Sequence, residues 1–142
     1  MSTSKLYAFQ EWLEAKISAV LPDGIEVLCR RKGNIESDIS NALASIGISV
    51  VVEPPLPTAW SKSYILKAET VESEIHIIEN VLLQNTEESA YTLLETLSKA
   101  LHEERCDELG GAVITLGAVQ DLSPADAPII HFVLPIQNSL NL

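Results

Sequence analysis

Apolar residues recur every three to four positions in three stretches of the chain, which is the spacing of one face of an α-helix. The three stretches run from about residue 5 to 21, from 35 to 46 and from 87 to about 105. Ser4, Asn34 and Thr86 stand where a side-chain oxygen can cap the first turn. Gly47 follows the second stretch and can supply the left-handed residue that ends a helix. The pattern predicts three helices.

Between these stretches, short runs rich in β-branched residues predict strands. The runs cover residues 25–29, 48–52, 64–68, 74–80, 113–119 and 129–136. Prolines and turn residues predict loops over 54–63 and 120–128, and residues 1–4 and 137–142 are expected to be flexible ends. The order is α-β-α-β-β-β-α-β-β. Helices interspersed with hairpin-like strands favour an α+β fold. In this fold we expect a mixed, largely antiparallel sheet packed with about three helices.

Length and charge narrow the class of protein. The 142 residues suit a single domain over residues 1–142, and 20 acidic against 9 basic side chains give a net charge of −11. Such a charge disfavours nucleic acid and anionic membranes as partners. Cys29 and Cys106 form no CxxC motif, which fits a reduced, cytosolic setting, and we find no signal sequence or membrane anchor.

Motifs for metal, nucleotide or nucleophilic chemistry are weak. His102 and Cys106 have the i, i+4 spacing of two ligands on a helix, but His76, Asp107 and Cys29 would have to converge on them from elsewhere. No phosphate-binding glycine motif or nucleophile elbow occurs. We therefore expect no metal, no cofactor and no catalytic residues.

Two alternatives keep some chemistry open. Glu69, Glu72 and Glu74 form an acidic patch that superficially resembles the carboxylate pair of an acid–base active site, although a solvated strand end explains them more simply. His131 reads as a strand residue, with a catalytic role as the alternative. A hydrolase built around His76, His102 or His131 would need one of these histidines beside a carboxylate or a cysteine.

The candidate interface residues are few. They are the basic run Arg30, Arg31 and Lys32, the loop residues Leu56 and Trp60, and the acidic loop residues Asp121 and Asp126. The basic run is either a solvated turn or a contact with an acidic face of a neighbouring subunit. Trp60 either folds back onto its own core or forms a contact surface beside the prolines.

Two segments resemble the tail-terminator, or tail-completion, proteins of long-tailed bacteriophages and their prophage relatives. The first is the helix and strand over 35–52 with the proline loop that follows, and the second is the strand 77–85 with the helix Tyr91 to Leu101. Together they cover about half of the chain. Val81 and Thr86 stand where these relatives often have proline and arginine.

The resemblance implies a small, non-enzymatic structural subunit that forms a ring, expected to be a hexamer, at the end of the tail tube. Its partners would be copies of itself, tail-tube proteins and head–neck proteins, with assembly in the bacterial cytoplasm and a final location in the virion tail. The alternative is a small cytosolic α+β domain that binds a ligand or peptide, or regulates a partner, through a pocket near Trp60 and Tyr64.

Overall fold

The computed structural model describes residues 4–30, 33–61, 66–83, 88–107, 110 and 113–142. Across these residues the chain forms three helices and a seven-stranded mixed sheet, which confirms the predicted α+β class. The helices are α1 (Lys5–Val20), α2 (Ile35–Ser45) and α3 (Ala90–Leu101). The strands are β1 (Val27–Cys29), β2 (Ile48–Val52), β3 (Leu56–Ser61), β4 (Lys67–Asn80), β5 (Thr115–Leu116), β6 (Gln120–Asp121) and β7 (Ile129–Asn141).

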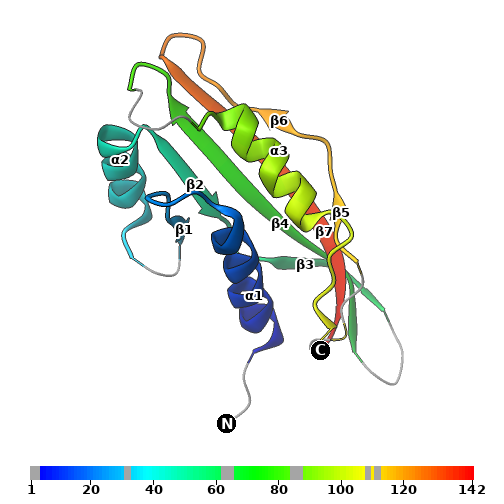
Figure 1. Ribbon diagram of the computed structural model, residues 1–142. Coiled ribbons are helices and arrows are strands. Elements are labelled where there is room, and N and C mark those ends of the chain that lie inside the picture. Colours follow the sequence, from blue (N-terminus) through cyan, green and yellow to red (C-terminus); the bar gives the residue numbers. More distant parts are fainter. Residues whose placement is uncertain (1–3, 31–32, 62–65, 84–87, 108–109, 111–112) are drawn as a thin grey trace.

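The long strands β4 and β7 pair antiparallel along their length and form the centre of the sheet. The hydrogen-bonded order is β1-β2-β4-β7-β5, with β3 also pairing with β4 and β6 with β7. Only β1 and β2 run parallel among the described pairs, and α2 connects them. Figure 1 shows the elongated shape that results, with the β6–β7 connection at one end and the paired ends of β3 and β4 at the other.

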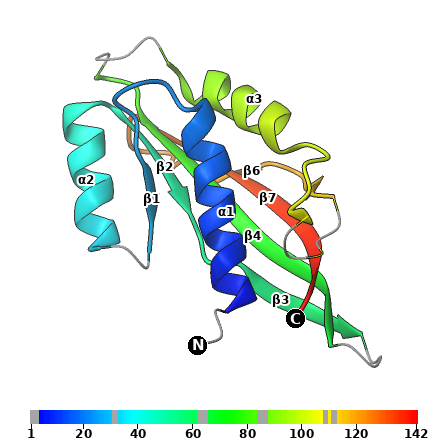
Figure 2. The same cartoon turned by 60° about the horizontal axis from the view of Figure 1, so that its bottom comes forward.

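The main core lies between one face of the sheet and the helices α1 and α3, which contact each other across that face (Figure 2). Fully buried side chains supply it from both layers. They include Phe9, Leu13 and Ile17 of α1, Leu93, Leu97 and Leu101 of α3, and Val50, Ile75, Ile77 and Leu134 of the sheet. Burial of this apolar surface is the principal stabilisation of the fold.

Local capping explains where the helices begin and end. Ser4 accepts a hydrogen bond from the backbone N–H of Tyr7, and Asn34 accepts one from Ser37, as the sequence predicts. Gly47 ends α2 with φ +91°, a conformation that favours glycine. Thr86, the predicted cap of α3, lies outside the described residues, and the side chain of Ser89 caps this helix instead.

The largest correction concerns residues 54–63, which the prolines led us to predict as a loop. Residues Leu56–Ser61 instead form β3, which pairs antiparallel with the first half of β4. Pro57 is tolerated there because an edge strand leaves alternate N–H groups without a ladder partner. Tyr64 and the rest of 62–65 lie outside the described residues.

Residues 67 and 68 of the strand expected over 64–68 and the whole strand expected over 74–80 belong to one strand, β4, which continues through the acidic stretch between them. Residues 64 and 65 lie outside the described residues. Val71, Ser73, Ile75 and Ile77 are buried on the helix side, whereas Glu72 and Glu74 alternate with them and are exposed. In a sheet with one face exposed to solvent, buried and exposed residues alternate along each strand, so the carboxylates fit within β4 and do not interrupt it.

Near the C-terminus the strands are also redistributed. The strand predicted over 113–119 is reduced to β5, and β6 falls within the predicted loop 120–128. The tail expected to be flexible over 137–142 belongs mostly to β7, and Leu140 is fully buried. Pairing with β4 orders this tail because Leu140 lies opposite Ala68 on the core side.

Candidate functional site

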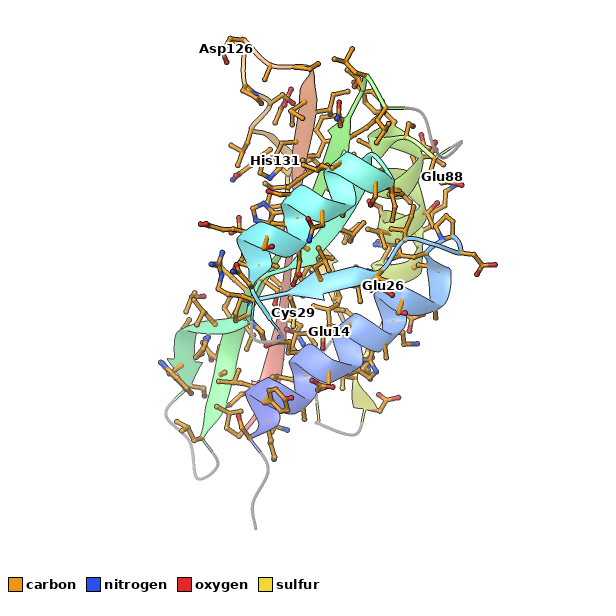
Figure 3. The ribbon with its side chains drawn as sticks, turned by 90° about the vertical axis from the view of Figure 1, so that its left-hand side faces the viewer. Glu14, Glu26, Cys29, Glu88, Asp126 and His131 are labelled. Carbon is orange, nitrogen blue, oxygen red and sulfur yellow. The ribbon has the colours of Figure 1, made fainter. Side chains whose placement is uncertain are left out.

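The face of the sheet turned away from α1 and α3 carries two histidines on neighbouring central strands. His76 of β4 is opposite Val133, and His131 of β7, which Figure 3 labels, is opposite Ile78. The register therefore places both imidazoles diagonally on this face. The Nδ1 atom of His76 lies 2.8 Å from the Nε2 atom of His131. One of these nitrogens donates the hydrogen bond and the other accepts it, so the pair shares one proton while both rings are neutral.

Charged groups continue from this pair in both directions across the sheet. On one side, Arg30 donates two hydrogen bonds to Glu53, at 3.1 and 3.0 Å. The hydrogen bond from Arg30 holds the pKa of the Glu53 carboxyl below its ordinary value, and the charge of His76 contributes to this lowering. Glu53 in turn raises the pKa of Arg30. Arg30, Glu53 and His76 thus form one electrostatic group.

On the other side of the pair lies Asp121 of β6. The hydroxyl and backbone N–H of Ser123 lower the pKa of the Asp121 carboxyl, and His131 adds a smaller electrostatic effect. Burial lowers the pKa of His131, and so does the neighbouring His76, whereas Asp121 opposes both effects. His131 therefore favours its neutral form.

A hollow with a volume of about 490 Å³ opens beside His76. Its lining includes the Arg30–Glu53 pair, Leu56 and the carboxylate of Glu74. The hollow lies where the chain leaves β2 for β3, so the two segments bordering β4 leave a gap at Pro54. Its size falls within the range of small-molecule sites.

A second hollow, of about 450 Å³, lies between α1, β1 and α2. Figure 3 shows Glu14, Glu26 and Cys29, which contribute to its lining from α1, from the residue before β1 and from β1 itself. The lining residues that the structure describes include the acidic side chains of Glu14, Glu26 and Asp38. This second hollow is separate from the face that carries the histidines, because Ile48, which contributes to its lining, belongs to the main core on the other face of the sheet.

The β3–β4 arm, defined here as residues 56–61 and 66–72, exposes several large apolar side chains. The exposed fractions are 64% for Leu56, 48% for Trp60 and 54% for Leu66. Trp60 therefore does not fold fully onto the core, the first of the two alternatives that the sequence left open. Leu56 pairs with Glu72, which is exposed, whereas Trp60 pairs with Ala68, which is buried, so the two side chains lie on opposite faces of the arm. Large exposed apolar side chains are a feature of protein contact surfaces.

The described residues of the predicted interface occupy four separate places. Arg30 and Leu56 line the same hollow, and Trp60 lies farther along the arm. Asp121 lies beside His131, whereas Asp126 is at the far end of the molecule in the β6–β7 connection (Figure 3). Arg31 and Lys32 lie outside the described residues.

The sequence also raised the possibility of metal or acid–base chemistry at several residues, which the structure places as follows. Over the described residues, no group of three or more histidine, cysteine, aspartate or glutamate side chains could hold a metal ion. Cys106 is buried, and the imidazole of His102 lies 3.6 Å from the carboxylate of Glu103, with both side chains exposed to solvent. Sequence reasoning missed the pairing of His76 with His131, for which the register of β4 and β7 is the only signal.

None of the helices in the described part of the chain is long and apolar enough to span a membrane. Comparison of the chain with protein-family models and with curated proteins gives no match.

Proposed function

We propose that the chain is a structural subunit, similar to a phage tail terminator, that assembles with copies of itself into a closed ring. In this role the ring caps the tail tube and joins it to the head–neck complex. The proposal assigns no catalytic residues to the chain. Assembly in the bacterial cytoplasm and a final location in the virion tail belong to the same proposal.

The observation that carries it is the β3–β4 arm. Three of the large exposed apolar side chains of the described residues, Leu56, Trp60 and Leu66, lie on this arm. Tryptophan is among the residues that supply most of the binding energy in protein interfaces, so Trp60 is the principal candidate anchor. The elongated shape also supports a head-to-tail contact, because the arm and the β6–β7 connection lie at opposite ends (Figure 1).

The test measures native mass by light scattering over a range of concentration and salt, followed by negative-stain imaging. We expect ring-shaped assemblies, with about six subunits as the family resemblance implies. The double variant Leu56→Ser, Trp60→Ser should shift the chain to monomer. The matched control is Leu82→Ser, because Leu82 is 78% exposed and follows the other end of β4.

A chain that stays monomeric at the highest attainable concentration would overturn the proposal of self-assembly. Rings that persist in the double variant would overturn the role of the arm. Circular dichroism and urea unfolding of each variant separate loss of assembly from loss of folding.

A second candidate is a small binding or regulatory domain, and the hollow of about 490 Å³ beside His76 favours it. This location differs from the pocket expected near Trp60 and Tyr64, since Trp60 does not line the hollow. Small molecules that bind a monomeric chain and shift the amide resonances of Thr58 and Glu74 would support this candidate over the ring.

A further inference from the structure

The histidine pair presents two imidazole nitrogens that face each other across rigid backbone. His76 and His131 belong to β4 and β7, whose pairing extends from Lys67 to Asn80 and is the longest described in the sheet. The ring centres are 5.0 Å apart and the ring planes are inclined by 49°. Imidazole nitrogens are common metal ligands, and here two of them already converge without a backbone change.

The spacing of the rings fits a bound metal ion. An ion about 2.0–2.1 Å from each nitrogen, with a tetrahedral angle between them, requires nitrogens about 3.3 Å apart and ring centres about 5.2 Å apart. The observed separations are 2.8 Å between the nitrogens and 5.0 Å between the ring centres. These separations show that the two nitrogens point almost directly at each other. Each ring must therefore turn by about 35° before both lone pairs meet at one tetrahedral ion. This is a change of side-chain rotation that leaves the strands in place.

The surroundings favour a positive ion at this point. The carboxylates of Glu53 and Asp121 interact electrostatically with His76 and His131, one from each side of the pair. Arg30 is held by Glu53, which offsets part of its charge. The hollow borders the His76 side of the pair, which gives water molecules access from that side.

We propose that His76 and His131 together bind one divalent late transition-metal ion, of the class Zn²⁺, Ni²⁺ or Cu²⁺. Imidazole ligands select these ions over Mg²⁺ and Ca²⁺, which prefer oxygen. Since the two imidazoles leave further positions to water, the ion is exchangeable and open to an additional ligand. This site is independent of ring assembly and of the β3–β4 arm.

The test uses the tag-free full-length chain, freed of metal with a chelator and then titrated with Ni²⁺ by calorimetry at pH 7.5. We expect one ion per chain and no heat from Mg²⁺. His76→Gln and His131→Gln should each weaken the affinity at least tenfold, because each removes one of two ligands. The matched control is His102→Gln, which changes an exposed histidine outside the pair and should leave the affinity unchanged.

A measurement on the unsubstituted chain keeps the test decisive if a variant fails to fold. Substoichiometric Cu²⁺ should broaden the imidazole resonances of His76 and His131 before any other histidine signal. Broadening centred on His102, absence of binding at millimolar Ni²⁺, or affinities within threefold of the native chain in both folded variants would each overturn the proposal.

Discussion

Replacement of Gly47 by alanine tests how tightly the end of α2 is fitted against the rest of the fold. Gly47 has φ +91°, and its carbonyl accepts a hydrogen bond from the N–H of Asn80 at 2.8 Å. A Cβ atom at this position would lie 2.7 Å from the carbonyl oxygen of Leu83. Because the obstacle is backbone, it cannot move aside as a flexible side chain would. Gly24 is a matched control, since it has the same φ of +91° with nothing within 4 Å of its Cβ position.

The two variants share every cost except the steric one. An L-residue in the left-handed region costs roughly 1–2 kcal/mol, and alanine restricts the unfolded chain equally at both positions. The close contact at Gly47 adds about 1–3 kcal/mol, the usual cost of forcing extra atoms into a packed site. We therefore expect Gly24→Ala to lower the free energy of unfolding by about 1–2 kcal/mol and Gly47→Ala by about 2–5 kcal/mol.

Urea unfolding at 25 °C, followed by circular dichroism, measures both values, and each kcal/mol corresponds to about 3 °C in Tm for a chain of this size. Equal m-values are required before the two free energies are compared. If Gly47→Ala and Gly24→Ala agree within about 0.5 kcal/mol, the argument from the Leu83 carbonyl is refuted.

Three further predictions rest on single contacts. Leu97→Ala should lower the free energy of unfolding by about 2–5 kcal/mol in the same urea assay, because Leu97 is fully buried between α3 and the sheet. A loss below about 1 kcal/mol would contradict the assignment of Leu97 to the core. Ser89→Ala should cost about 1 kcal/mol and Ser89→Gly only a few tenths, since Ser89 caps α3; equal losses would argue against the cap. The folded pKa of Glu53 is below its unfolded value, so the stabilisation is present above the ordinary carboxyl pKa of 4.5 and is lost as the pH falls below it. Unfolding measured at a series of pH values should show a shallower acid-side slope in Arg30→Ala than in the native chain, and identical slopes would exclude the pair as the cause.

Periodicity and capping predicted the helices and β2 because these signals are local. Asn34 and Gly47 mark the two ends of α2 by backbone chemistry that a neighbouring strand does not change. The run Ile48 to Val52 is β-branched and wholly buried, so its assignment as a strand did not depend on its partners.

The missed features depend on pairing rather than on local preference. Residues Leu56 to Ser61 have two prolines before them and one among them, yet β4 supplies hydrogen bonds that make the segment a strand. The same holds for the tail after Ile136, which becomes ordered because β4 extends far enough to pair with it. Whether such a segment forms a strand depends on the strand that it pairs with. The register of that pairing is not visible in a single sequence.

The histidine pair is the extreme case of this dependence. His76 and His131 are 55 positions apart, and each looks like an ordinary strand residue until the register sets them diagonally across two strands. A slip of one residue in β7 would turn His131 towards α3 and abolish the pair. Any chemistry of this face is therefore encoded in the sheet register rather than in a motif.

The Arg30–Glu53 contact changes how the predicted interface should be tested. Sequence reasoning assigned Arg30 to a contact between subunits, but its guanidinium is already engaged with Glu53 of the same chain. Charge reversal at Arg30 would break this internal pair, so a loss of assembly could not be attributed to the interface. Leu56 and Trp60 avoid this ambiguity, because they are exposed on the arm and lie outside the main core. Truncating them would remove the apolar contact that the proposed assembly requires while leaving the internal ion pair intact, which makes the arm the sharper test of assembly.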